Sequence, residues 1–173
     1  MQTLYYLANS VLSFLVYAFL LRVLLQVVRA DFRNPLAQAV VALTNWLVLP
    51  LRKILPPVGR FDTASLVALV GVQVGAKLIL QRLVLQPMPY GLVIEAARSL
   101  ALATLMLYTI LIFVYAALSF VAPGAHSPAT TLLASLCEPV LQPLRRVLPI
   151  VGGLDFSPLV AIVGLTALRI LIS

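Results

Sequence analysis

Long uncharged runs of apolar residues are the first pattern along this chain. Leu4–Leu21 contains no charged residue and the apolar pattern continues to Val28, while Leu100–Ala122 is a second uncharged run of 23 residues. An α-helix needs about 20 residues to cross the hydrocarbon core of a bilayer. We therefore predict one transmembrane helix in each run.

Two further apolar segments, at about 63–85 and 158–173, each contain cationic side chains. These cations are Lys77, Arg82 and Arg169. We predict that both segments also cross the membrane, which gives an all-α membrane protein with four transmembrane helices. Strands are disfavoured, because a closed barrel needs many alternating segments of about 10 residues and the sequence does not contain them.

One 13-residue motif occurs twice in the sequence. PLRKILPPVGRFD begins at Pro50 and PLRRVLPIVGGLD begins at Pro143, an offset of 93 residues, with eight of the 13 positions identical. The first apolar run also falls on the third at this offset. We therefore predict a single membrane domain, 1–173, built from two parallel repeats at about 4–85 and 97–173. Each repeat contains a transmembrane helix, a long link and a second transmembrane helix.

Each link is predicted to contain an amphipathic helix, near 35–49 and 128–142. Asn34-Pro35 and Ser127-Pro128 are typical of a capping residue followed by proline in the first helical turn. The second link has a polar stripe at helical spacing, and the first has a weaker one. The residues at these matched positions are Thr131, Ser135, Glu138 and Gln142, and Gln38, Ala42, Asn45 and Leu49. A helix with one apolar and one polar face lies in the membrane interface rather than crossing it.

The repeated line itself is predicted to be a basic elbow that returns the chain from the interface into the bilayer. Its first proline ends or kinks the interfacial helix, a second proline stops the next turn, and glycine permits the bend. We expect the aspartate that ends each elbow to cap the following helix, to pair with a nearby arginine, or to do both. The structural residues of the two elbows are Pro50, Pro56, Gly59, Asp62, Pro143, Pro149, Gly152 and Asp155.

Each elbow also carries a basic pair, Arg52-Lys53 and Arg145-Arg146. Near an anionic leaflet each such cation contributes about 1 kcal/mol of attraction to lipid headgroups. Anchoring to lipid is one interpretation, and a docking surface for an acidic partner is the other. The two links hold seven basic residues, against at most four on the opposite side. Because short cytoplasmic loops are enriched in Lys and Arg, we predict that the links are cytoplasmic and the termini periplasmic.

Four cations lie inside or near the ends of apolar runs: Arg22, Lys77, Arg82 and Arg169. We expect each to reach the interface with its long side chain or to pair with a carboxylate. The alternative is that they line a small transporter or an anion-conducting pore, which would need an oligomer because four helices are few. Gly71 and Gly75 offer a packing face for such an oligomer, and Gly164 matches Gly71 in the second repeat.

Composition excludes several classes of function. Of the 173 residues 62% are hydrophobic and 10% are charged, which favours lipid rather than water as the surroundings. His126 and Cys137 are the single residues of their types, so they form neither a metal cluster nor a disulfide, and nothing near His126 supports haem ligation. The net charge of +7 is explained by orientation and lipid contact rather than by nucleic acid. We expect no enzyme activity and no cofactor.

The doubled motif Pro-Leu-Arg-[Lys/Arg]-x-Leu-Pro…Gly…Asp resembles the YggT (also YlmG) family of bacterial and plastid membrane proteins. Residues 21–25, Leu-Arg-Val-Leu-Leu, resemble the end of that family's first helix. The resemblance covers almost the whole chain, in the two-repeat form. It implies an integral protein of the bacterial inner membrane, associated with osmotic or ionic stress tolerance, cell division and nucleoid distribution. In plastid relatives it implies assembly of membrane complexes.

From these observations we expect a non-enzymatic membrane scaffold or assembly factor. The alternative is a transporter or channel component for ion and osmotic homeostasis. The expected partners are membrane lipids with anionic headgroups, a membrane or cytoplasmic protein, or a second copy of the chain.

Overall fold

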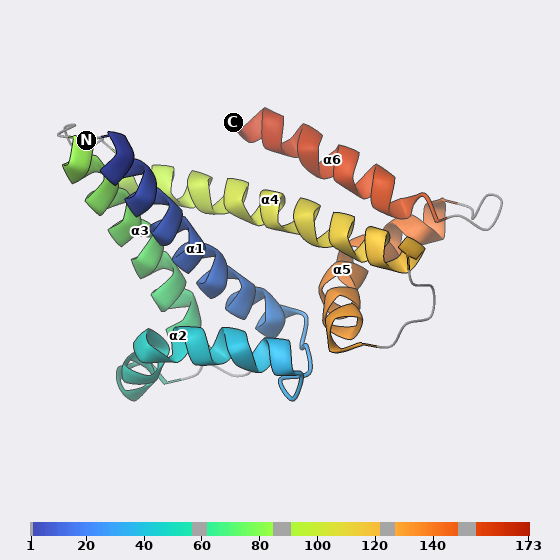
Figure 1. Cartoon of the computed structure of the whole chain (residues 1–173), viewed down its shortest axis with the longest axis horizontal. Coiled ribbons are helices and arrows are strands. Elements are labelled where there is room, and N and C mark those ends of the chain that lie inside the picture. Colours follow the sequence, from blue (N-terminus) through green and yellow to red (C-terminus); the bar gives the residue numbers. More distant parts are fainter. Residues whose placement is uncertain (1, 57–61, 85–90, 122–126, 149–154) are drawn as a thin grey trace. The chain divides into compact units, whose positions relative to one another are not determined.

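The chain is described by a computed structural model that covers residues 2–56, 62–84, 91–121, 127–148 and 155–173 (Figure 1). Within these ranges it forms helices and no strand, which confirms the predicted all-α class. The helices are α1 (Gln2–Val27), α2 (Pro35–Ile54), α3 (Thr63–Val84), α4 (Leu92–Val121), α5 (Pro128–Val147) and α6 (Ser157–Ile172). Gly59, His126, Pro149 and Gly152 lie outside the described residues.

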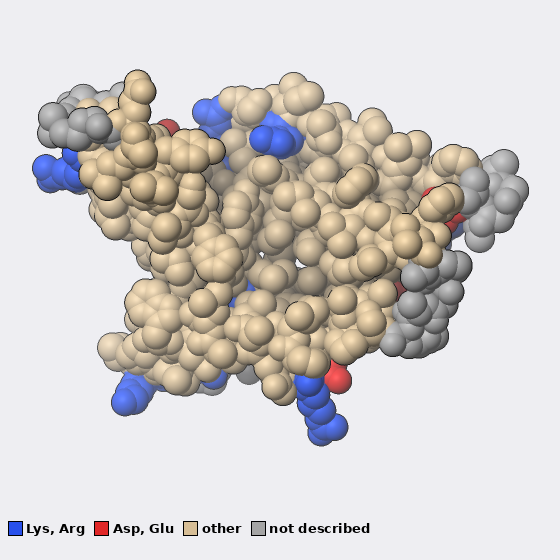
Figure 2. All heavy atoms as spheres, viewed as in Figure 1, with Lys and Arg blue, Asp and Glu red and all other residues tan. Residues whose placement is uncertain are grey.

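Among the described helices, α1, α3 and α4 are long and apolar enough to cross a membrane. The fourth predicted span, α6, is apolar but has 16 residues. At 1.5 Å per residue it is about 24 Å long, which is shorter than the hydrocarbon core of about 30 Å. Uncharged residues also cover most of the face shown in Figure 2, as expected for a surface in contact with lipid.

The helix predicted in the run Leu100–Ala122 begins eight residues earlier than that run, because α4 begins at Leu92. Gly91 precedes the helix with a φ of +96°, a left-handed conformation that glycine adopts at little cost. Its carbonyl accepts a hydrogen bond from the Glu95 amide at 3.0 Å. With 30 residues α4 is about 45 Å long, enough for the hydrocarbon core and both headgroup zones. Glu95 and Arg98 are therefore helical residues near the end of a span.

The predicted starts of α2 and α5 are confirmed by their caps. Asn34 Oδ1 accepts a hydrogen bond from the Leu36 amide at 2.9 Å. Ser127 Oγ accepts from the Thr130 amide at 3.2 Å, and Thr130 Oγ1 accepts from the Ser127 amide at 2.9 Å, which makes a reciprocal capping box. These bonds satisfy amides that have no partner inside the helix.

Pro50 and Pro143 are each predicted to end or to kink their helix, and the structure shows the second of these effects (Figure 1). Both prolines lie inside their helices, which continue to Ile54 and Val147. Proline removes one backbone hydrogen bond and bends a helix without always stopping it, and Figure 1 shows both helices bent. Both basic pairs therefore occupy the last turn of a helix, where the helix dipole favours positive charge.

The two-faced character predicted for α5 is confirmed. Leu132, Leu136, Cys137 and Leu141 are buried on one face, while Thr131, Glu138 and Gln142 are exposed on the other. In α2 the buried positions are Ala37, Thr44 and Val48. This pattern is typical of a helix that lies along an apolar surface.

The chain divides into two compact units, each with its own packing. The first, Met1–Val27 with Ala39–Ala101, packs α1 along α3, where Ala64, Ala68 and Ala76 are buried and leave room for close approach. The second, Val28–Gln38 with Leu102–Ser173, packs α5 against α6. Its core is formed by Ile112, Cys137, Leu141 and Ala161.

The three glycines proposed for helix packing have open space where a side chain would begin. A β-carbon added at Gly71, Gly75 or Gly164 would meet nothing within 4 Å. Any packing role they have is therefore toward another chain or lipid, and it stays a prediction.

Candidate functional site

Each elbow aspartate binds the arginine ten residues before it. Arg52 Nε donates to Asp62 Oδ2 at 3.0 Å, and Arg145 Nε donates to Asp155 Oδ2 at 2.8 Å. Arg52 Nη2 contacts the same oxygen of Asp62. The pairs are 93 residues apart and use the same atoms, so the predicted pairing with a nearby arginine is confirmed in both repeats.

The two pairs are partly shielded from solvent. The Asp62 side chain is 15% exposed and the Asp155 side chain 33%. Burial alone would raise the pKa of Asp62, but hydrogen bonds from Arg52 and Ser65 hold that pKa below its usual value. Burial would likewise raise the pKa of Asp155, and hydrogen bonds from Ser157 and Arg145 outweigh it and lower the pKa. Both aspartates are therefore ionised at neutral pH.

The expected cap on the following helix is formed by the Asp155 side chain but not by the Asp62 side chain. Asp155 Oδ1 accepts from the backbone amide of Ser157, the first residue of α6, at 2.9 Å. The Asp62 carboxylate instead accepts from the hydroxyl of Ser65, in the first turn of α3, at 2.7 Å. In the first elbow Asp62 is thus bound to the side chain of a helix residue, Ser65. In the second, Asp155 is bound to the backbone amide of a helix residue, Ser157.

Arg22 is buried within the first unit, with 1% of its surface exposed. Its Nη1 donates to Thr44 Oγ1 at 2.7 Å, to Asn45 Oδ1 at 2.9 Å and to the Val41 carbonyl at 3.3 Å, and its Nε donates to Ser65 Oγ at 3.0 Å. The expectation that Arg22 snorkels or pairs with a carboxylate is therefore wrong. Neutral oxygens of α2 and α3 take the place of water around the guanidinium.

A continuous polar chain follows from these contacts. Arg22 donates to Ser65, Ser65 donates to Asp62, and Asp62 accepts from Arg52. Gln26, one turn after Arg22, donates to Ser65 Oγ at 3.1 Å and to Asp62 Oδ2 at 3.4 Å. The chain joins α1, α2 and α3 around the first elbow. In the sequence, the one hint is that Arg22 and Gln26 share a face of α1.

The other cations of the apolar runs differ from Arg22. Lys77 Nζ lies 3.5 Å from Glu95 Oε1, so its predicted pairing with a carboxylate is confirmed. Arg82 and Arg169 are exposed in the described chain, and their reach toward the interface stays a prediction.

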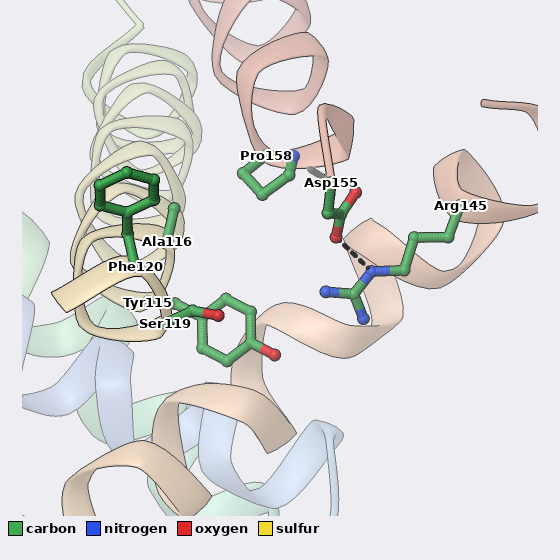
Figure 3. Close-up of a pocket in the computed structure, with 7 residues that line it drawn as sticks. All are labelled: Tyr115, Ala116, Ser119, Phe120, Arg145, Asp155 and Pro158. Carbon is green, nitrogen blue, oxygen red and sulfur yellow. Dashed lines mark hydrogen bonds and ion pairs between the residues drawn. The ribbon is translucent and has the colours of Figure 1, made fainter. Parts of the chain in front are cut away.

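A cavity of about 210 Å³ lies beside the second elbow (Figure 3). Its lining residues are Tyr115, Ala116, Ser119, Phe120, Arg145, Asp155 and Pro158. Figure 3 shows the Tyr115 ring reaching from α4 toward the guanidinium of Arg145. Burial lowers the pKa of Arg145, but Tyr115 and Asp155 outweigh this and raise it. One wall of the cavity is thus a firmly charged ion pair.

Cysteine and acidic residues do not assemble into a metal site in the described part of the chain. No group of three or more His, Cys, Asp or Glu side chains able to hold a metal ion occurs there. Cys137 lies in the core of the second unit, and its burial raises the pKa of the thiol to about 12. The thiol is therefore protonated at physiological pH.

Comparisons with known proteins agree on one family. The family model described as CCB3/YggT matches residues 1–83 and 94–173. A protein of Pseudomonas aeruginosa, named as uncharacterized, is 38% identical over 160 residues, covering 88% of this chain and 79% of its own. YggT of Escherichia coli strain K12, also named as uncharacterized, is 35% identical over 165 residues, covering 94% and 85%. No solved structure matches the chain.

Proposed function

The chain belongs to the CCB3/YggT family of membrane proteins, and we propose that it is a non-enzymatic scaffold or assembly factor of the bacterial inner membrane. One observation carries the proposal. Each amphipathic helix ends in a basic pair whose first cation is fixed to an aspartate, while the second, Lys53 or Arg146, is exposed. Each elbow therefore presents an exposed cation from a helix turn whose backbone is held in place by an Arg–Asp pair.

The surface that these cations define suits an acidic protein segment or anionic lipid headgroups. The Arg–Asp pairs hold the last turns of α2 and α5 against the next helix, so little backbone entropy remains to be lost on docking, while the side chains of Lys53 and Arg146 have still to be ordered. Electrostatic attraction to such a surface increases the rate and selectivity of encounter more than it increases affinity.

The proposal includes the membrane arrangement predicted from the sequence. Four helices cross the bilayer, both links and their basic pairs face the cytoplasm, and both termini face the periplasm. A second copy of the chain docks through Gly71 and Gly75, whose surroundings in this chain leave space for another helix. The roles implied by the family, in cell division or in osmotic and ionic stress tolerance, then depend on which partner docks.

Site-specific photocrosslinking in native membranes tests the docking surface. The photoreactive residue is placed at Leu49 and, in a second protein, at Gln142, because these positions match between repeats and lie one turn before the basic pairs. We expect adducts that are lost in the double variant Lys53→Glu/Arg146→Glu and kept in Arg82→Glu, which changes an exposed cation elsewhere. Adducts that survive the double charge reversal would refute the docking surface.

A measurement of ion flux distinguishes the transporter alternative from the scaffold. Arg22 is enclosed by hydrogen-bond acceptors and Lys77 is paired with Glu95, an arrangement that supports structural roles for both cations. Purified protein in liposomes should therefore give no more K⁺, Na⁺ or Cl⁻ flux than empty vesicles. Flux above that background, lost when Lys77 is replaced by Met, would favour the transporter.

A further inference from the structure

The amphipathic helices α2 and α5 bury matching positions but expose different residues. Thr44 and Val48 of α2 are fully buried, and so are Cys137 and Leu141, their equivalents at the offset of 93 residues. The outer faces differ in character. From residue 43 onward, the exposed large apolar residues of α2 are Leu43, Trp46, Leu49 and Ile54. Their equivalents in α5 are Leu136, Pro139, Gln142 and Val147.

In α5 the leucines of the apolar stripe lie inside the protein. Leu132, Leu136 and Leu141 are buried, whereas Glu138 and Gln142 are exposed. A helix in the membrane interface needs an uncovered apolar face to place among the acyl chains. The apolar stripe of α5 is already covered by protein, so this helix has little left to offer to lipid.

In α2 the polar side chains are the ones used inside the protein. Thr44 Oγ1 and Asn45 Oδ1 both accept from Arg22 Nη1, at 2.7 and 2.9 Å. The first repeat has a buried arginine to satisfy, whereas the second has Tyr115 at the equivalent position. Helix α2 therefore turns polar groups toward α1 and leaves its tryptophan and large apolar side chains on the outside.

We propose that the outer face of α2, and not that of α5, lies in the phospholipid of the membrane interface. The proposal rests on the membrane arrangement of the proposed function and distinguishes its two elbows. Trp46 is 61% exposed, and its ring meets that of Phe19 edge-on with centroids 6.2 Å apart. One side of the indole is thus packed on α1 and the rest faces outward. Tryptophan is enriched at the membrane interface, because its ring is apolar and its N–H is a hydrogen-bond donor.

The charges of α2 also fit a phospholipid surface. Lys53 is exposed seven residues after Trp46, and a lysine can reach headgroup phosphates while its apolar stem lies along the acyl chains. Gln38, Asn45 and Arg52 follow one another at intervals of seven residues, so they form a polar line along one flank of the helix. Helix α2 thus has an apolar outer face, a cation for the phosphates and a polar flank for water, which is the pattern of a helix lying in the interface.

The test uses the full-length protein in phosphatidylcholine nanodiscs, where the emission of a single tryptophan reports its surroundings. Trp46 is the one tryptophan of the sequence, so the parent protein reports on α2 directly. The matched variant Trp46→Phe/Pro139→Trp moves the indole to the equivalent exposed position of α5. Bromine atoms on the acyl chains close to the headgroup quench an indole in the interface, and acrylamide quenches an indole in water.

We expect brominated lipid to remove most of the Trp46 emission, and acrylamide to remove little of it. At position 139 acrylamide should remove most of the emission and brominated lipid little. The variant Trp46→Phe/Gln142→Trp keeps Pro139 and should respond as position 139 does, which controls for any change in fold caused by replacing a proline.

The proposal is overturned if acrylamide quenches Trp46 more than brominated lipid does, or if the positions on α2 and α5 respond alike. Protection of Trp46 from both quenchers also overturns it, because a second copy of the chain would then cover the face. The nanodiscs contain no partner, so this test and the photocrosslinking test of the docking surface can fail separately. Quenching as expected, together with photocrosslinks that survive the charge reversal, would reject the docking surface and retain the lipid-facing α2.

Discussion

The Nε atom of Arg22 lies 3.0 Å from the Oγ atom of Ser65, so a charged side chain of α1 is bound inside the protein to a hydroxyl of α3. The same hydroxyl donates to Asp62, which accepts from Arg52 at the end of α2. A buried charge is costly unless hydrogen bonds replace its hydration. This chain of contacts supplies them, and it fixes the first elbow to both neighbouring helices.

Removing the Arg22 side chain should strongly destabilise the first unit. In Arg22→Ala the side-chain oxygens of Thr44 and Asn45 lose their Arg22 donor, Ser65 keeps its hydrogen bond from Gln26, and a cavity forms between the helices. We expect a loss of about 2 to 4 kcal/mol in the free energy of unfolding, measured in detergent. The matched control is Arg169→Ala, an exposed arginine in an apolar helix, with a loss below about 0.5 kcal/mol. Equal losses in the two variants would show that the Arg22 contacts add no stability.

The two elbow aspartates should contribute unequally to stability. The Asp62 carboxylate accepts from Arg52, Ser65 and Gln26, and its side chain is less exposed than that of Asp155. We expect Asp62→Asn to cost about 1 to 2 kcal/mol and Asp155→Asn about 0.5 to 1 kcal/mol. Glu138→Gln, at an exposed site 3.9 Å from its arginine, is the control with little effect. A larger loss for Asp155→Asn would contradict the ranking.

Stability should fall in acid because of the same two groups. The folded-state pKa of Asp62 and that of Asp155 both lie below the usual value of 3.8. An unfolded chain with a pKa of about 3.9 then binds more protons than the folded one. The contribution is fully present above about pH 5, and it decreases as the pH falls through the unfolded and then the folded pKa. Thermal melts between pH 6 and pH 3 should show this decrease, and the double variant Asp62→Asn/Asp155→Asn should show a flatter profile.

Cys137 should resist alkylation in the folded protein. Its thiol is buried and its pKa is raised to about 12, so little thiolate exists at pH 8 and reagent cannot reach it. We expect labelling by maleimide to be at least about 100-fold slower than in the protein unfolded by detergent, as followed by mass spectrometry. Rapid labelling of the native protein would mean that the core of the second unit opens readily.

The repeated pattern of the sequence predicted much of this arrangement. Apolar runs located α1, α3 and α4, and the Asn34 and Ser127 signals located the starts of α2 and α5, because these features depend on local chemistry. The repeat also predicted that Asp62 and Asp155 play equivalent parts. The ends of α2 and α5 were misplaced, because whether a proline stops a helix depends on the packing around it.

The surroundings of Arg22 could not be predicted, because they depend on contacts between distant segments. Thr44 was not among the candidate residues, and Asn45 was assigned to the polar stripe of an interfacial helix. Only the folded chain places both against α1. The start of α4 was misplaced for a different reason: Glu95 and Arg98 are charged, and charge near a span is as compatible with a helix end at the headgroups as with a loop.

The central claim is that two hairpins place both basic elbows on the cytoplasmic side, and single-cysteine labelling in a Cys137→Ala background tests it most directly. Cysteines replace Gln2 and Ser173 at the termini, and Gln38 and Gln142 on α2 and α5, all exposed positions. In intact cells a membrane-impermeant maleimide should label positions 2 and 173, and should label positions 38 and 142 only after permeabilisation. Protection of position 173 together with 142 would mean that α6 does not cross the membrane, and the reverse pattern at all four positions would contradict the orientation and the cytoplasmic docking surface.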